Sequence, residues 1–508
     1  MCLFPKLMKI SLFHIVTAQL LTISIVFEWF LTSQKGPFRK KHFRESFTFE
    51  GANCPSPQVI LILNAAFWYS LFRDFYAPFT KIEDTMEQLG LLPLETLPPR
   101  VKYNLLFEHL PSMSIIKEKS RGRPSISQDA LLKAFIYKAL RRINTLTDLC
   151  FELKNNPMVS QAVGLNPYES LPSIERFSQF LRHTAHPVLQ RVRIQLVQSL
   201  LAEHVVSADH LVLDSCPILA NVRENNLKTP STRRFEKTRL PKGDPDAHLG
   251  VLIHFPHPPK KVVRYFWGYR NHIVADAQEE LPLWEITHPA DVSEIHQAIP
   301  LLKKTQETFS VSISTVSGDA VYDAENILCF IMEDLKALAI IPRNPRGDKT
   351  RPYSLKGNSV FCQANLPMHR KGKMSVKKAG ITYLQYSCPI HFRHQRQRHL
   401  LCPVAHPKFT TQKGCNALIR LTPSIRERID YGSKAFKDLQ KKRTSVERIF
   451  SRLLSISMQD LPVSGMEAVK NYCTIAHITV LLIALAANRA GYSDKIRFVR
   501  SFVPNFLS

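Results

Sequence analysis

Apolar positions recur at helical spacing between residues 120 and 205. A serine that can cap a helix, Ser125 or Ser127, precedes leucine, phenylalanine and isoleucine side chains three to four positions apart. A second cap, Ser173, precedes another segment of the same pattern. We expect a small all-helical domain with Lys and Arg on its outer faces. This pattern is typical of DNA-binding helix-turn-helix modules, and equally of a helical spacer that packs on the next domain.

Apolar runs separated by turns predict strands and helices after residue 205. Residues 210–218 form a short apolar segment, in which we expect a strand that ends at an acid, Asp214. Two strands joined by a polar turn at 277–280 follow, then a helix, a strand ending at Asp319, a helix and a last buried strand. This order predicts an α/β domain.

Two long apolar segments lie near the ends of the chain. Residues 471–492 predict a core helix, because two asparagines and a histidine interrupt the apolar run. Residues 10–30 are long enough to cross a bilayer. For this leader a membrane anchor, an amphipathic helix, and translated sequence upstream of a true start such as Met86 stay open. We favour a cytoplasmic, nucleoid-associated protein over a membrane protein, with an N-terminal anchor as the alternative.

Positive charge dominates the chain: 68 Lys and Arg against 42 Asp and Glu give a net charge of +26. Positive charges in such excess repel one another unless a polyanion binds to them. Nucleic acid is the first candidate for this polyanion, and an anionic membrane surface is the alternative. Residues 341–420 hold 16 Lys or Arg and one acid, Asp348. We expect a β-rich basic insertion at 345–420 that follows a phosphate backbone. The side chains assigned to DNA there are Lys377, Lys378, Arg393, Arg396 and Arg398.

Ten cysteines are scattered along the chain without a repeating framework, which favours a reducing compartment. Four lie in or beside the basic insertion: Cys362, Cys388, Cys402 and Cys415. Four thiolates can hold a structural zinc ion, but these spacings are wide and no Cys-x-x-Cys pair occurs. We favour free thiols in a β-rich lobe and keep zinc as the alternative.

Three acids stand where a two-metal phosphodiester reaction needs carboxylates, namely at strand ends and on an adjacent helix. Asp214 and Asp319 follow buried strands, and Gly318 allows close approach of a ligand to the second acid. Glu447 lies on a basic helix, one turn after Arg443 and on the same face. An acid at a strand end is more often a turn or cap residue, so the argument depends on all three together. Asp323, near the second acid, is expected to cap the following helix.

Five stretches resemble the DDE transposases of insertion sequences, whose catalytic domain is RNase H-like. They are GRPSISQDALLKAFIYKALRRINTLTDL, LVLDSCPILANVRENN, FWGYRNHIVADAQEELPLWEITHPADVSE, SGDAVYDAENI and KKRTSVERIFSRLL. They occur in the family's order over about residues 120–490. SGDAVYD and RTSVERIFSRL are the most specific of these motifs.

The resemblance implies a function and a set of site residues. Asp214, Asp319 and Glu447 would be the catalytic acids and would bind magnesium or manganese. The reaction would cleave phosphodiester bonds at the element's ends and transfer the strands into target DNA. The partners would be terminal inverted repeats and target DNA, with a homodimer in the DNA complex. Arg443 and Arg448 are assigned to DNA on the same basis.

The chain departs from the family pattern around Glu447. The helix of this acid often carries a Tyr three residues before the Arg and a Lys seven residues after the Glu. Gln440 and Leu454 stand at those two positions. These departures keep a second hypothesis open: a catalytically impaired, transposase-derived DNA-binding protein.

The expected fold class is α/β: an RNase H-like mixed-sheet catalytic domain with a basic β-rich insertion, preceded by a small all-helical domain. The predicted divisions are a leader at 1–75, a linker or helical extension at 76–119, the helical domain at 120–205, the catalytic domain at 206–344 and 421–495, and the insertion at 345–420.

Overall fold

The structure, a computed structural model, describes residues 94–113, 126–230, 232–257, 260–344, 353–357, 359–376, 381–394, 401–411 and 413–502. The chain divides into two compact units, 1–82 and 83–508, and all described residues belong to the second. Several predictions fall outside the described residues. They concern the leader, the start at Met86, the DNA contacts of Lys377, Lys378, Arg396 and Arg398, and the side chain of Arg393.

Helices fill the first described part of the chain. They are α4 (Pro99–Glu108), α5 (Gln128–Leu140), α6 (Leu146–Asn155), α7 (Pro157–Ala162), α8 (Ile174–His183) and α9 (His186–Ala202). The side chain of Ser127 accepts a hydrogen bond from the backbone N–H of Ala130 at the start of α5, and that of Ser173 accepts one from Arg176 at the start of α8. Both predicted caps are therefore confirmed, with Ser127 rather than Ser125 at the first.

A six-stranded mixed sheet forms the centre of the second unit. Its strands are β1 (His210–Leu219), β2 (His248–His257), β3 (Lys260–Asp276), β4 (Pro282–Pro289), β5 (Thr315–Ser317) and β6 (Leu338–Ile340). The order is β2-β3-β1-β5-β6, and β4 pairs with β3 as well. The pairs β1–β3, β2–β3 and β3–β4 are antiparallel, whereas β1–β5 and β5–β6 are parallel. The predicted mixed α/β arrangement is present.

Three strand details differ from the expectation. Strand β1 does not end at Asp214 but continues to Leu219, because β3 pairs with it along the whole length. Strand β5 ends at Ser317, two residues before Asp319. Strand β2 was missed, because its segment follows a basic, turn-rich stretch that gives no clear strand pattern.

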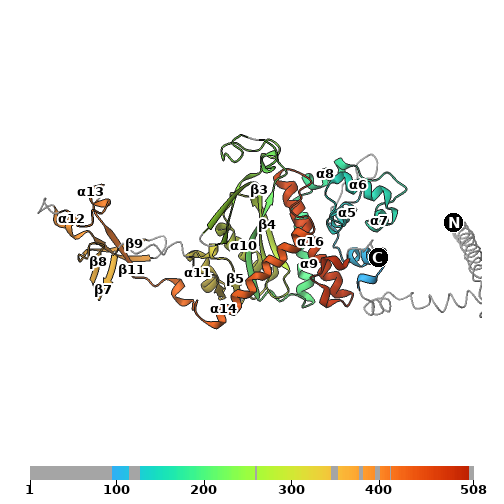
Figure 1. Cartoon of the computed structure of the whole chain (residues 1–508). Helices are drawn as coiled ribbons and strands as arrows, with labels where there is room; N and C mark the ends of the chain where they lie inside the picture. The colour runs from blue at the N-terminus through green and yellow to red at the C-terminus, as the bar shows by residue number, and fades with distance from the viewer. Residues whose placement is uncertain are drawn as a thin grey trace, which may run out of the picture. The chain divides into compact units, whose positions relative to one another are not determined.

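One long helix joins the helical part to the sheet. Helix α16 (Met466–Arg489, red in Figure 1) packs against α5, α8 and α9, and also against β4. Its side chains belong to the same hydrophobic core as those of the helices and the sheet. It is the one helix of the described residues with the length and apolar character of a membrane span, and 94% of its most apolar window is buried inside the protein. The predicted core helix is therefore confirmed.

Helices cover the sheet near the strands that carry the acids. Helix α10 (Glu294–Phe309) packs on β3 and β4. The predicted helix after Asp319 is split into α11 (Glu325–Cys329) and a π-helical turn at Phe330–Asp334. The predicted helix around Glu447 is α14 (Lys434–Lys441) and α15 (Ser445–Ser455), joined by the 3₁₀ turn η9 (Lys442–Thr444). Helix α15 packs on β1 and α16.

The basic insertion is a separate small β structure, as predicted. It holds the hairpin β7 (Tyr353–Lys356) and β8 (Ser359–Cys362), and the sheet β9 (His369–Val376), β10 (Ile381–Ser387) and β11 (Asn416–Arg420), with short helices α12 (Pro389–His394) and α13 (Lys408–Thr411). Its own small core includes Val360, Met368 and three of the cysteines.

Ion pairs attach the segment after the insertion to the segment after Asp319. Nε of Arg426 lies 2.6 Å from Oδ1 of Asp323, and Oδ2 of the same acid accepts a hydrogen bond from the backbone N–H of Asn344. Arg420 pairs with Glu325 in the same region. The prediction that Asp323 caps a helix is wrong, because Ala324 is the N-cap of α11 and the carboxylate of Asp323 bonds to Arg426 instead.

Candidate active site

The first acid lies in the middle of the central strand. Asp214 pairs with Ile273 of β3, and the residues before it in β1 are buried. Burial raises the pKa of Asp214 to about 7, and the negative charges of Asp319 and Glu447 act in the same direction. The backbone N–H of Ser215 and the guanidinium of Arg443 lower it. These interactions show that the three predicted acids face a common region.

The second acid follows the strand beside it. Because β5 runs parallel to β1, the turn after β5 lies toward the same end of the strands as the second half of β1. Asp319 is the N-cap of the short 3₁₀ turn Ala320–Tyr322, and its carboxylate is half exposed. A Cβ added at Gly318 would come within 3.0 Å of the ring of Tyr322, so the chain passes closely over that ring.

The third acid lies on α15 and is connected to the second through one arginine. Nη1 of Arg443 lies 3.0 Å from Oδ1 of Asp319, and Nη2 lies 2.8 Å from Oε1 of Glu447. The Arg443 side chain is 21% exposed, whereas that of Glu447 is 58% exposed. A cation thus bridges two of the three acids, and the predicted proximity of Arg443 and Glu447 on one helical face is present.

A second arginine lies beside Asp214 and was not predicted. Arg270 of β3 donates from Nη1 to Oγ of Ser215 at 3.2 Å and forms an ion pair with Glu294 of α10. Burial lowers the pKa of Arg270, and the nearby Asp214 acts in the opposite direction. Arg270 is the one Lys or Arg in the second half of β3, and this was the available signal for it.

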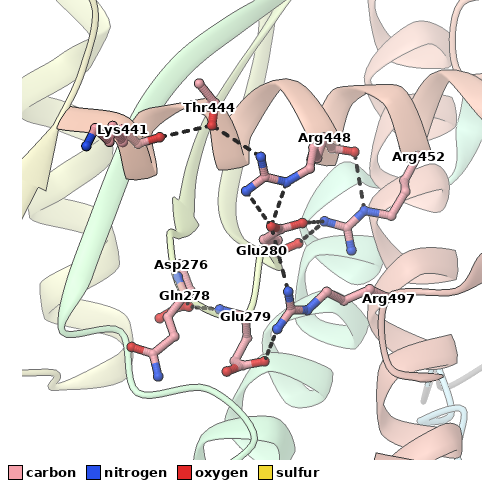
Figure 2. A network of polar contacts seen from close by, with 9 residues as sticks. All are labelled: Asp276, Gln278, Glu279, Glu280, Lys441, Thr444, Arg448, Arg452 and Arg497. Atoms are coloured by element: carbon pink, nitrogen blue, oxygen red, sulfur yellow. Dashed lines mark hydrogen bonds and ion pairs between the residues drawn. The ribbon is translucent and has the colours of Figure 1, made fainter. Parts of the chain in front are cut away.

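A buried carboxylate on the β3–β4 turn holds the helix of Glu447, and the sequence analysis missed it too. Glu280 accepts a hydrogen bond from Nε of Arg448 at 2.7 Å and from Nη2 of Arg452 at 3.1 Å (Figure 2). Arg497 lies 3.7 Å from the same carboxylate and pairs with Glu279 at 2.9 Å. Burial lowers the pKa of Arg452 to about 10. Sequence spacing alone cannot reveal contacts between residues 168 positions apart.

The arginines assigned to DNA differ in what they contact. Arg443 lies between two acids, and Arg448 contacts Glu280 and Oγ1 of Thr444 at 3.2 Å. Their contacts with DNA, and that of Arg393, stay predictions.

Three of the insertion's cysteines lie together in its core. Cys362, Cys388 and Cys415 are buried, because Ser387 of β10 pairs with Asn416 of β11 and so brings the adjoining cysteines together. Burial raises the pKa of Cys415 to about 12, and neighbouring Cys388 and Cys362 add to the effect. Cys402 is half-buried and accepts a hydrogen bond from the backbone N–H of His406. Zinc at these four thiols stays a prediction.

The acids have the chemistry that a hard divalent cation needs, since carboxylate oxygens are the preferred ligands of magnesium and manganese. Among the described residues no group of three or more His, Cys, Asp or Glu side chains stands in a ready arrangement for a metal ion. Arg443 provides the positive charge between Asp319 and Glu447. Carboxylates at these three positions have the chemistry of ligands for a divalent ion, and Arg443 occupies the space between two of them.

Two sequence families match the chain. A family described as "Transposase DDE domain" matches residues 246–482, and one described as "Transposase domain (DUF772)" matches residues 95–183. The first match contains Asp319 and Glu447, while Asp214 lies before it. A comparison with curated proteins gave no match. A solved piggyBac transposase synaptic complex with hairpin DNA aligns over 80% of this chain and 81% of that one, at 10% identity and a TM-score of 0.30.

Proposed function

This chain belongs to the DDE-type transposases of insertion sequences, and from that premise we propose that it cleaves DNA at the ends of its element and joins them to target DNA. The proposal is supported by the two ion pairs of Arg443, with Asp319 and with Glu447, and by the charges of these two acids, which raise the pKa of Asp214. Three acids from two neighbouring strands and a packed helix match the donor set that such a reaction requires.

The strand arrangement supports an RNase H-like catalytic domain as part of this proposal. The order β4-β3-β1-β5-β6 has three antiparallel strands followed by two that run parallel to β1. Asp214 lies on β1 and Asp319 follows β5, so both lie at the middle of this strand order. Glu447 lies on α15, which packs on β1.

The residues of the site have separable roles. Asp214, Asp319 and Glu447 would hold magnesium or manganese, which when bound activates water or a 3′-hydroxyl and neutralises the leaving oxygen. Asp214 must first release the proton that its raised pKa retains near neutral pH. Arg443, once free of the acids, is placed to hold a DNA phosphate next to them. No covalent bond between protein and DNA is needed.

DNA binding in this proposal is shared between the active site and the insertion. The net charge of +26 and the basic β lobe supply long-range attraction to the phosphate backbone. We place the protein in the cytoplasm at the nucleoid and expect a homodimer when terminal repeats are bound. Recovery of the full-length chain in membranes would overturn the placement, and a monomer in the terminal-repeat complex would overturn the homodimer.

A catalytically impaired DNA-binding protein is the second candidate. It is favoured by Gln440 and by Leu454, whose side chain packs against the hydrophobic core of the protein. A cleavage assay on terminal-repeat DNA separates the two candidates. Asp214→Ala and Glu447→Ala should abolish metal-dependent cleavage and leave DNA binding intact. Persistent cleavage in either variant would refute the assignment, and an inactive wild type would favour the impaired protein.

A further inference from the structure

We propose that Glu280 is a positioning residue, which fixes the helix of Glu447 so that this acid meets Asp214 and Asp319. The inference rests on the proposed function, because it assigns Glu280 a part in building the metal-binding site. Glu280 touches none of the three acids in the structure. It acts through Arg448 and Arg452, which lie on the same helix, α15, as Glu447.

The contacts of Glu280 are numerous and directional. Nε and Nη2 of Arg448 lie 2.7 Å and 2.6 Å from Oε1, and Nη2 of Arg452 lies 3.1 Å from Oε2 (Figure 2). Nη2 of Arg452 also donates to the backbone carbonyl of Glu280 at 2.6 Å. Two arginines one helical turn apart are therefore attached to one residue, and charge-assisted bonds of this kind are the strong ones.

The turn that carries Glu280 is itself held firmly. The carboxylate of Asp276 accepts hydrogen bonds from the backbone N–H groups of Gln278 at 2.9 Å, Glu279 at 2.6 Å and Ala208 at 3.0 Å. Glu280 has a φ of +56°, a conformation that non-glycine residues adopt at a cost and keep only where their surroundings enforce it. Its side chain is only 10% exposed. The turn is therefore held by hydrogen bonds that are independent of α15.

Glu280 supplies directional contacts to α15 that the apolar face of this helix does not supply. Its buried face, Val446, Ile449 and Leu453, packs into the core, and apolar packing alone does not set direction. A metal-binding residue must be held to within about 0.5 Å and 10–20° of its working geometry. Bonds from Glu280 to two successive turns fix both the rotation and the axial position of the helix, and therefore the place of Glu447.

A role in stability alone explains this arrangement less well than a positioning role does. A buried ion pair recovers little more than the cost of removing its charges from water, so it is a weak source of stability. Arg452 and Glu280 are both nearly buried, yet they join the one helix of the site to a turn far away in sequence. The adjacent carboxylate, Glu279, forms its ion pair with Arg497 rather than with an arginine of α15, which makes Glu279 a matched control.

The test measures Mn²⁺ binding to the full chain without DNA, by electron paramagnetic resonance at pH 8. Glu280→Gln should weaken Mn²⁺ binding about tenfold, the lower end of the loss seen when groups that orient metal ligands are removed. Glu279→Gln should bind Mn²⁺ within about twofold of the wild type. Circular dichroism and the midpoint of thermal unfolding check that each variant is folded.

A second variant covers the case in which Glu280→Gln does not fold. Arg448→Met keeps most of the side-chain stem, and the Arg448 side chain is 55% exposed, so the fold should tolerate the change. It should weaken Mn²⁺ binding severalfold, since Arg452 is then the only one of the two α15 arginines that still holds Glu280. Binding equal to the wild type in the folded variants would overturn the positioning role, whatever happens to their thermal stability.

The same experiment tests the proposed metal site separately from the positioning role. Glu447→Gln should weaken Mn²⁺ binding more than Glu280→Gln does. If the wild type binds no Mn²⁺, or Glu447→Gln binds it equally well, the proposed metal site fails. If those two behave as expected and only Glu280→Gln matches the wild type, the positioning role alone fails.

Discussion

Nη1 of Arg443 lies 3.0 Å from Oδ1 of Asp319, and the same guanidinium reaches Glu447 on the next turn of its own helix. One basic side chain thus pairs with two of the three acids. A divalent cation and Arg443 therefore compete for the same carboxylates. A DNA phosphate, in turn, competes with the acids for Arg443.

Removing Arg443 should improve metal binding while impairing the reaction. In Arg443→Gln we expect Mn²⁺ to bind more tightly without DNA, by up to about fivefold, because an exposed ion pair contributes up to about 1 kcal/mol. Cleavage of terminal-repeat DNA should fall, because a phosphate contact is lost. Titration calorimetry with Mn²⁺ measures the first effect. Lys441→Gln is the control, because Lys441 pairs with Asp438 rather than with the acids; weaker Mn²⁺ binding in Arg443→Gln would contradict the competition.

The free energy of unfolding of the metal-free chain should depend on pH through the carboxyl group of Asp214. Its pKa is about 7 in the folded chain against an ordinary value of 3.8, so between these pH values the folded state holds a proton that the unfolded state has released. The contribution of Asp214 to the free energy of unfolding therefore falls as pH rises from about 4 to 7. Asp214→Asn removes this dependence. Urea unfolding should show the variant gaining stability relative to the wild type as pH rises; a constant difference would contradict it.

Metal affinity should show the opposite pH trend. Metal ligation requires the ionised carboxylate, so each bound ion displaces the proton of Asp214. Below pH 7 the Mn²⁺ affinity should rise about tenfold per pH unit, and above pH 7 it should level off. Titrations at several pH values measure the slope. An affinity that does not change between pH 5.5 and 7 would exclude Asp214 as the titrating ligand.

DNA affinity should depend steeply on salt through the basic lobe. Each phosphate neutralised by a Lys or Arg contributes about −0.9 to the slope of log affinity against log salt concentration. The double substitution Lys377→Gln, Lys378→Gln should therefore reduce the slope by about 1.8 if both side chains contact phosphate. Fluorescence anisotropy over a salt series measures it. An unchanged slope would remove these lysines from the DNA interface.

The insertion's thiols should behave as protonated core residues. Burial and its cysteine neighbours raise the pKa of Cys415 to about 12, so it should react with iodoacetamide at pH 8 much more slowly than half-buried Cys402. Mass spectrometry of labelled peptides compares the two. One tightly bound zinc per purified chain, with all four cysteines protected, would show that zinc is present instead.

The elements with strong local signals could be predicted from the sequence. Helix α5 has a serine cap and regular apolar spacing, and α16 has a long apolar run, so both are found where expected. Strand β1 was found but ended too early, because its continuation past Asp214 depends on pairing with β3. Strand β2 was missed, since its pairing partner rather than its own pattern makes it a strand.

The site could be predicted only in part, for the same reason. Asp214, Asp319 and Glu447 were proposed through motifs, and Arg443 pairs with the second and the third of these acids in the structure. Glu280 and Arg270 were missed, because their roles depend on contacts across the fold. A sequence motif marks the residues that perform chemistry, whereas the residues that orient them are revealed by the packing of distant elements.

The most direct test of the account replaces one acid by a ligand with a different metal preference. A thiolate binds manganese better than magnesium, so Asp319→Cys should lose cleavage of terminal-repeat DNA in Mg²⁺ and recover part of it in Mn²⁺. Asp319 is half exposed, and the substitution should leave the fold intact. The account predicts rescue by manganese in the variant but not a comparable gain in the wild type. Cleavage by Asp319→Cys in Mg²⁺ at the wild-type rate would contradict it.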